Sequence, residues 1–355
     1  MRTPTASRAV PALLALVCLC HAAVAAPGAT ESVGSGVARQ NNLIVGNVID
    51  VDIGADRVDF EMAKGGVARI EMLDSNLARI RFNFTGEFTA RTSPAIAPQF
   101  LVPPGAAITE LTTHVLIATD AMTIRVNRTP FSIDAFWPDD TPLQRDAEPA
   151  IIWNLTSGTV TMLKEAPSDE VYFGMGERGG PINRRGRYLT MRTVDSGAYY
   201  DFTDPMYKSF PFFYGVRNNR AWGLFFDNPA EPFFDFDFGQ TQTLAVGAKA
   251  GELNYYLIAG PEPATVANTY ARLTGFNPLP PKWAIAYHHS RFGWSSADEI
   301  TSIALGLRDG AYPCDALFLD LDYLDKRHMF TWDPVTFPDP IGFNQNLDNL
   351  GFRRV

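Results

Sequence analysis

Residues 317–340, LFLDLDYLDKRHMFTWDPVTFPDP, predict a buried strand that ends in acidic side chains. The strand extends from Leu317 to Leu321, and Asp320 and Asp322 lie at its end. In parallel α/β sheets and barrels, binding and catalytic groups gather at the C-terminal ends of strands. The pattern therefore favours Asp320 as a binding residue, because it is nearest to the end of the strand. A loop aspartate that only caps the next helix or binds water is the alternative.

Strands and helices alternate around this stretch. The expected elements are a strand at 283–288, a helix from Ser296 to Gly310, a strand at 315–321, a helix at 342–349 and a strand from 352. This β-α-β-α-β order is typical of the opening of a parallel α/β domain, here at residues 282–355. Two or three strands cannot close an eight-stranded barrel and leave unpaired edges, so we expect low stability for this part by itself.

Residues 40–276 have a β pattern without helical periodicity. Residues 78–84 alternate, with Ile80, Phe82 and Phe84 on one face and polar side chains on the other. Further strands are expected at 112–119, 123–126, 131–137, 221–226 and 253–258. Many short strands separated by Gly, Pro and Asn indicate an antiparallel β-sandwich. The proline-rich segment NPLPP at 277–281 then separates it from the α/β part.

Residues 1–25 are typical of a secretory signal peptide. Arg2 and Arg8 precede a short apolar stretch, and Ala23-Val24-Ala25 fits a cleavage site. The stretch is shorter than the roughly 20 residues that a membrane span needs, so we expect export to the periplasm or medium. Removing this segment would change the formal net charge from −9 to −11. An acidic chain without a basic stripe argues against nucleic acid as a partner.

Cysteine and histidine usage predicts neither a disulfide nor a metal site. Cys18 and Cys20 lie in the signal segment, and Cys314 opens a buried strand, where we expect it in the core. The five histidines are scattered apart from His288-His289, and their spacing matches no metal site. We expect no cofactor. The sequence does not indicate an oligomeric state.

Two aromatic segments are further candidates for binding. The segment HHSRFGW at 288–294 places Arg291 and Phe292 in a loop, where a ring and a guanidinium suit a sugar; packing under the loop is the alternative. Residues 199–238 contain fifteen aromatic side chains with interleaved aspartates. Most of these rings are expected in the sandwich core, with a few left for a sugar-binding rim.

Several motifs in order resemble glycoside hydrolase family 31, the α-glucosidase and α-xylosidase family. They are VYFGMGER at 171–178, RRGR at 184–187, DPMYKSFPF at 204–212, PKWA at 281–284, SRFGWSS at 290–296, DLDY at 320–323 and FTWDP at 330–334. The resemblance covers roughly residues 45–355. It implies a galactose-mutarotase-like β-sandwich followed by a (β/α)₈ barrel, of which the chain contains the first strands.

The resemblance also implies substrate contacts. The first aspartate of the D-x-D-Y run, Asp320, would contact the sugar that is cleaved, with Leu321 beside it. Asp195 matches an acid that an N-terminal loop supplies, although residues 191–194 lack the family's Trp-Asn pair. Phe292 stands where the family has Trp, next to Arg291, and the smaller ring leaves the specificity open. The implied substrate is an α-linked glucoside or xyloside oligosaccharide.

No residue of the chain is assigned a catalytic role. Family members are retaining enzymes with a nucleophile and a general acid/base about 5 Å apart. The resemblance places the nucleophile in a W-x-D-M-N-E type run after the fourth barrel strand and the acid/base later still; neither matches a segment here. We therefore expect no turnover by these 355 residues. A non-catalytic carbohydrate-binding sandwich and an α-glucosyltransferase of the same family are the alternatives.

Overall fold

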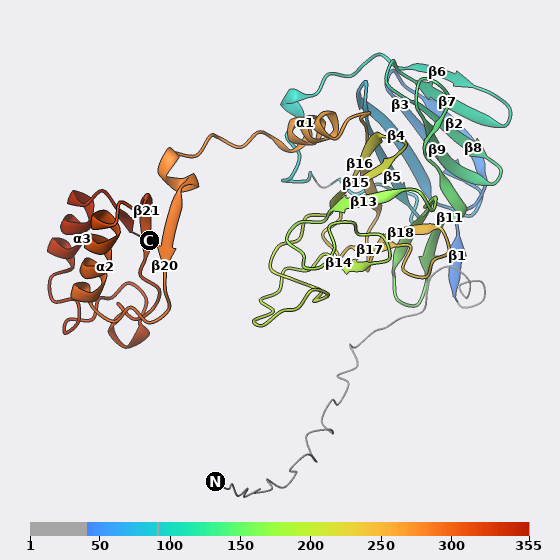
Figure 1. Ribbon diagram of the computed structural model, residues 1–355. Helices are drawn as coiled ribbons and strands as arrows, with labels where there is room; N and C mark the ends of the chain where they lie inside the picture. The colour runs from blue at the N-terminus through green and yellow to red at the C-terminus, as the bar shows by residue number, and fades with distance from the viewer. Residues whose placement is uncertain (1–40, 91, 355) are drawn as a thin grey trace, which may run out of the picture. The chain divides into compact units, whose positions relative to one another are not determined.

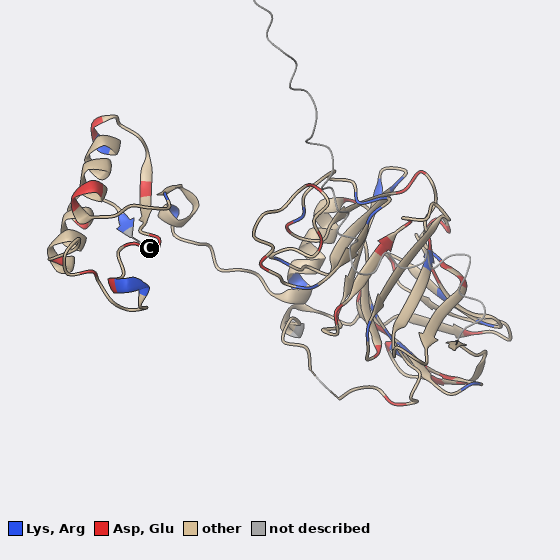
Figure 2. Ribbon diagram, turned by 90° about the horizontal axis from the view of Figure 1, so that it is seen from below, with Lys and Arg blue, Asp and Glu red and all other residues tan. Residues whose placement is uncertain are grey.

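The computed structural model describes residues 41–90 and 92–354, so the predicted signal peptide lies outside the described residues. The chain divides after Gly275 into two compact units. We call the described residues up to Gly275 the β unit and those from Phe276 onward the α/β unit (Figure 1). Figure 2 shows acidic and basic residues interspersed along the strands and loops of the β unit.

Three antiparallel sheets build the β unit, as the alternating sequence predicts. The eight-stranded sheet has the order β13 (Val171–Gly174), β15 (Phe212–Arg217), β16 (Arg220–Phe226), β19 (Leu253–Ala259), β5 (Leu77–Asn83), β4 (Val67–Asp74), β3 (Arg57–Met62), β2 (Val48–Ile53). The six-stranded sheet has the order β1 (Asn42–Ile44), β11 (Asp146–Asn154), β12 (Val160–Glu165), β18 (Thr243–Ala248), β17 (Phe233–Phe236), β14 (Tyr188–Thr190). The five-stranded sheet has the order β10 (Pro142–Gln144), β9 (Phe131–Phe136), β8 (Thr123–Arg128), β7 (His114–Ala118), β6 (Ala107–Glu110).

The two faces of strand β5 show how the sequence pattern becomes a sandwich. Ile80 and Phe82 are buried in a core to which all three sheets contribute. Arg79 and Arg81 point to the opposite face, as the alternation predicts. Because successive side chains on a strand point to opposite faces, this single pattern gives one apolar and one polar surface.

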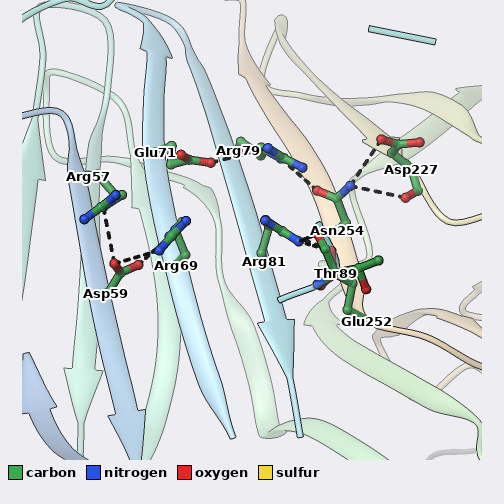
Figure 3. A network of polar contacts seen from close by, with 10 residues as sticks. All are labelled: Arg57, Asp59, Arg69, Glu71, Arg79, Arg81, Thr89, Asp227, Glu252 and Asn254. Atoms are coloured by element: carbon green, nitrogen blue, oxygen red, sulfur yellow. Dashed lines mark hydrogen bonds and ion pairs between the residues drawn. The ribbon is translucent and has the colours of Figure 1, made fainter. Parts of the chain in front are cut away.

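The polar face of the eight-stranded sheet is covered by paired charges (Figure 3). Asp59 lies between Arg57 and Arg69, with Oδ1 accepting from Arg69 Nε at 2.5 Å. Arg81 pairs with Glu252 at 2.6 Å and stacks on the ring of Phe88 at 4.5 Å. These contacts leave Arg81 only 7% exposed although it faces away from the core.

Helix α1 (Pro263–Thr274) corrects the expectation of an all-β pattern up to residue 276. It covers another part of the eight-stranded sheet, beside β16 and β19. Val266 and Leu273 are fully buried against Phe225 and Ile258 of that sheet. Pro263 occupies the first turn, where its missing N–H is not needed.

A buried ion pair connects all three sheets. Lys164 of β12 lies 2.6 Å from Asp146 of β11 and donates to the hydroxyl of Tyr255 of β19 at 3.0 Å. The second carboxylate oxygen of Asp146 accepts the backbone N–H of Ile133 in β9 at 2.7 Å. Both charged side chains are at most 3% exposed. Their polar atoms are therefore satisfied by one another and by neighbouring strands, as burial of charge requires.

The α/β unit has the predicted β-α-β-α-β order. Its elements are η3 (Lys282–Ile285), β20 (Tyr287–Ser290), α2 (Ala297–Asp309), β21 (Cys314–Phe318), η4 (Asp325–Arg327), α3 (Pro340–Asn349) and β22 (Arg353–Arg354). The β unit also contains a 3₁₀ turn, η2 (Pro98–Phe100). The three strands are parallel, in the order β20-β21-β22. The predicted strand at 283–288 is wrong in its first half, because residues 282–285 form a 3₁₀ turn.

Both helices lie on one face of this sheet (Figure 1). Ile300 of α2 and Leu347 of α3 are fully buried with Leu317 of β21. Cys314 is 1% exposed and has a free thiol, so its predicted place in the core is confirmed. The predicted start of α2 is also confirmed, since the Ser296 hydroxyl accepts the backbone N–H of Glu299. No helix in the described parts of the chain is long and apolar enough to span a membrane.

Candidate functional site

Two loops leave the parallel sheet at neighbouring carboxyl ends. Ser290, the last residue of β20, is paired with Phe318, the last residue of β21. Arg291 and Phe292 therefore follow one strand where Asp320 follows the other. Carboxyl ends of parallel strands meet at one edge of a sheet, which is the usual place for ligands in such folds. Four of the five predicted site residues, Leu321 included, are carried by these two loops.

Asp320 lies two residues after the end of β21, with its backbone in the left-handed region at φ 60°. Leu319 is 4% exposed and belongs to the core, whereas Asp320 is exposed and Leu321 is 41% exposed. The chain thus turns sharply from core to solvent at the aspartate, a residue that tolerates this conformation. Within the described residues, the Asp320 carboxylate forms no ion pair, so it is free to accept hydrogen bonds from a ligand.

The loop that bears Asp320 is supported from within. The Tyr323 carbonyl accepts the backbone N–H of Asp333 at 2.8 Å, and the rings of Tyr323 and Trp332 lie 4.9 Å apart. The ring of Trp332 also lies 5.6 Å from the ring of Phe337. The Asp333 carboxylate accepts the N–H groups of Thr336 and Val335, which lower its pKa. This aromatic base joins the loop to the helix-packed core.

The loop after β20 has one exposed ring and one buried ring. Phe292 is 69% exposed, and Gly293 follows it in the left-handed region at φ 92°. Trp294 is fully buried, with its ring 5.4 Å from that of His289. The Glu299 carboxylate accepts the N–H of Ser295 at 2.9 Å, and this bond lowers the pKa of Glu299. The buried Trp294 anchors the loop and leaves Phe292 accessible to a planar ligand face.

Asp195, the fifth predicted residue, belongs to the β unit. It lies on an exposed loop between β14 and β15, and its Oδ1 accepts the N–H of Gly197 at 3.1 Å. The nearby rings of Tyr199, Tyr200 and Phe202 are 56%, 81% and 68% exposed. Acidic and aromatic side chains on this loop could bind the hydroxyls and the apolar face of a sugar.

Most rings of the aromatic segment 199–238 are in the core, as predicted. The buried ones are Phe212, Phe213, Trp222, Phe225, Phe226, Phe233, Phe234 and Phe236. Phe213 makes edge contacts with Trp222 and Phe236 at 5.5 and 5.1 Å. Such edge-to-face pairs are the preferred packing of aromatic rings. Three of the exposed rings, Tyr199, Tyr200 and Phe202, lie in the Asp195 loop, and Phe210 and Phe238 are exposed elsewhere in the segment.

The sequence analysis did not predict the buried charged side chains of the β unit. Glu170 is 4% exposed and accepts hydrogen bonds from Trp222 Nε1 and the Tyr172 hydroxyl, each at 2.8 Å. Burial raises the pKa of Glu170, and these two bonds oppose the rise.

In residues 41–90 and 92–354, no group of three His, Cys, Asp or Glu side chains is placed to hold a metal ion.

Sequence profiles of known families match both units. Residues 67–235 match the glycosyl hydrolase 31 N-terminal galactose mutarotase-like domain. Residues 277–355 match the glycosyl hydrolases family 31 TIM-barrel domain. The chain belongs to glycoside hydrolase family 31. The loops with Arg291 and Asp320 thus lie in the part that matches the family's barrel domain, and Asp195 lies in the part that matches its mutarotase-like domain.

Individual family 31 proteins agree with this assignment. Alpha-glucosidase 2 of Bacillus thermoamyloliquefaciens is 32% identical over 291 residues, which are 82% of this chain and 37% of that protein. The Flavobacterium johnsoniae GH31 dextranase, a mutant complexed with isomaltotriose, superposes with a TM-score of 0.82 at 27% identity. The same dextranase complexed with glucose gives 0.81 at 28% identity. In both comparisons the match covers 88% of this chain and 38% of the dextranase, so the chain spans little more than a third of these relatives.

Proposed function

We propose that this chain is the substrate-binding part of a retaining α-glycosidase of the α-glucosidase type. The observation that carries the proposal is the pair of adjacent carboxyl-end loops in a family 31 chain. One loop presents the exposed carboxylate of Asp320, and the other presents the exposed ring of Phe292. A carboxylate accepts hydrogen bonds from sugar hydroxyls, and an aromatic face packs against the apolar face of the sugar ring.

The proposed roles follow from position and exposure. Asp320 accepts hydroxyl hydrogen bonds of the sugar that is cleaved, and Leu321 supplies an apolar contact next to it. Phe292 forms a wall of the pocket, and Arg291 donates to a hydroxyl oxygen. Asp195 is a further substrate contact, carried by the β unit. The nucleophile and the general acid/base of double displacement are proposed to lie in barrel segments that match nothing in this chain.

Isothermal titration of the 355-residue chain with isomaltotriose tests the proposal. We expect saturable binding with a Kd of about 1 mM, since only part of the sugar surface would be covered. Asp320→Ala should weaken it about tenfold through the lost hydrogen bonds to the sugar. Asp315→Ala, an aspartate substitution within the preceding strand β21, is the control and should leave binding unchanged. An unchanged affinity in Asp320→Ala, or no binding by the wild-type chain, would contradict the proposed role of Asp320.

A hydrolysis assay with 4-nitrophenyl α-glucoside and α-xyloside tests the expected lack of turnover. We expect no release of 4-nitrophenol by the 355-residue chain from either compound. Turnover at rates typical of enzymes would show that the two catalytic carboxyl groups are present after all. Preferred binding of xylosides over glucosides would shift the proposed substrate to α-xylosides.

We also propose that the protein is exported. The basic start, the short apolar stretch and the Ala23-Val24-Ala25 site support this. Mass spectrometry of the N-terminus after expression tests it, with cleavage after Ala25 as the expected result. A retained Met1 in the cytoplasmic fraction would refute it.

A further inference from the structure

The loop that carries Asp195 is closed at its base by one buried arginine. The loop comprises residues 191–203, between Thr190 at the end of β14 and Asp204. Arg178 Nη2 donates to the Thr190 carbonyl at 2.8 Å, and Arg178 Nη1 lies 3.1 Å from Asp204 Oδ1. Arg178 therefore contacts both ends of the loop at the same time.

Asp204 completes this closure from the other side. Its Oδ2 accepts the backbone N–H of Thr190 at 2.8 Å and also a short hydrogen bond from the Thr190 hydroxyl. The two residues that flank the loop, Thr190 and Asp204, are thus joined directly as well as through Arg178. Charge-assisted bonds of this kind are shorter and stronger than those between neutral groups.

Burial makes Arg178 and Asp204 depend on each other. The Arg178 side chain is 0% exposed and that of Asp204 is 15% exposed. Burial lowers the pKa of Arg178, Asp204 opposes the shift, and the nearby Arg187 adds to it. Among the described residues, Asp204 is the carboxylate that pairs with Arg178. Removal of either partner would leave a buried charge without compensation.

A second set of contacts holds the loop next to Asp195. The Tyr207 hydroxyl donates to the Gly197 carbonyl at 3.1 Å, and its ring makes an edge contact with Tyr199 at 6.2 Å. The N–H of the same Gly197 donates to Asp195 Oδ1. A continuous set of contacts therefore connects Tyr207, which follows the loop, with the Asp195 carboxylate.

We propose that Arg178 and Asp204 are positioning residues that hold the Asp195 carboxylate in its binding orientation. The proposal rests on the proposed function, in which Asp195 contacts the substrate. Arg178 and Asp204 act through the loop and do not touch the sugar. Their contribution is to fix the loop before the ligand arrives, which removes an ordering cost from binding.

Limited chymotrypsin digestion of the intact chain measures the loop directly, because Tyr199, Tyr200 and Phe202 are exposed cleavage sites within it. In Arg178→Met and Asp204→Asn we expect cleavage at these three sites to be at least about tenfold faster, as local opening becomes easier. Arg178→Lys keeps the charge but not the paired geometry and should lie between wild type and Arg178→Met.

Arg185→Met is the matched control, because Arg185 forms another arginine–aspartate pair of the β unit, with Asp237 at 2.6 Å. It should leave cleavage of the 191–203 loop unchanged. Unchanged loop cleavage in Arg178→Met, or the same acceleration in Arg185→Met, would overturn the proposal.

Isomaltotriose titration distinguishes this proposal from the function on which it rests. If Asp195→Ala weakens binding and Arg178→Met weakens it to the same extent, both are supported. If Asp195→Ala weakens binding but Arg178→Met does not, the positioning role is refuted and the substrate role of Asp195 stands. If chymotrypsin cleaves the loop faster in Arg178→Met but neither Asp195→Ala nor Arg178→Met changes the affinity for isomaltotriose, Asp195 does not contact the substrate. The proposed positioning role of Arg178 and Asp204 then fails as well.

Discussion

The β unit and the α/β unit differ in how completely they bury their own apolar surface. In the β unit, the core draws on three sheets and encloses even charged side chains such as Lys164. In the α/β unit, three strands and two helices leave large side chains in water, with Leu279, Phe330 and Ile341 91%, 98% and 84% exposed. The loops with Asp320 and Phe292 are therefore carried by the α/β unit, which has the smaller core.

The largest expected difference is in the resistance of the two units to unfolding. Hydrogen exchange of the intact chain in increasing urea should show β21, α2 and α3 losing protection well before β5 and β19. Small parts bury a smaller fraction of their surface, so we expect the opening free energies to differ by about 5 kcal/mol or more. Loss of protection in both units at the same urea concentration would remove the contrast.

Breaking the buried pair of the β unit should give the next largest effect. Lys164→Met leaves the Asp146 carboxylate buried without its partner and should lower the unfolding free energy of the β unit by about 3–5 kcal/mol. Urea denaturation followed by tryptophan fluorescence measures this loss.

Two substitutions serve as controls for the buried pair. Lys249→Met breaks the exposed pair with Glu231 in the β unit, and Arg327→Met breaks the pair with Asp322, which is the exposed counterpart in the α/β unit. Exposed pairs contribute little because water screens them, so both variants should stay close to wild type. A loss in either control as large as that in Lys164→Met would show that burial is not the cause.

A smaller effect is expected at the start of helix α2. Ser296→Ala removes the hydroxyl that accepts the Glu299 N–H and should cost the α/β unit about 1 kcal/mol. Glu262→Ala is the matched substitution at the start of α1, where the side chain forms no cap bond, and should have no measurable effect. Exchange protection of the two helices reports both changes. Equal losses would mean that the cap bond is not what stabilises α2.

The sequence predicted elements better than contacts between distant residues. The alternation at Ile80 and Phe82 was sufficient for a strand with one buried face, and Ser296 was sufficient for a helix start. Helix α1 was missed because β-branched residues such as Thr265 and Val266 weaken its helical signal. Its proline start and the stripe of Val266, Thr269 and Leu273 were the signals that could have revealed it.

The candidate site shows the same division. The change from apolar to acidic residues after Leu319 predicted that the chain would leave the core near Asp320, but the predicted strand end at Leu321 is wrong, because β21 ends at Phe318. The closure of the Asp195 loop was not predictable, because Arg178, Thr190 and Asp204 are 12 and 14 residues apart and no sequence period places them together. The 3₁₀ turn at residues 282–285, which contains Trp283, was missed because an apolar run alone does not distinguish a turn from a short strand.

The smallest expected effects are opposite responses of the two units to pH. Burial raises the pKa of Glu170 in the β unit above its usual 4.5, whereas hydrogen bonds from Thr336 and Val335 hold the pKa of Asp333 in the α/β unit below its usual 3.8. A raised carboxyl pKa gives stability at low pH that is lost as pH rises through the folded-state value. A lowered one gives stability above about pH 4 that is lost as pH falls.

Two nearly isosteric variants isolate these contributions in thermal unfolding between pH 3 and 7. Glu170→Gln resembles the protonated acid, so its midpoint should equal that of wild type near pH 3 and rise above it as pH increases. Asp333→Asn keeps an oxygen that accepts the two backbone N–H groups but loses the charge. Its midpoint should fall below that of wild type at pH 7 and approach it in acid. Differences from wild type that have the same sign in both variants would contradict the contrast between a buried carboxyl group and a half-buried one that accepts backbone hydrogen bonds.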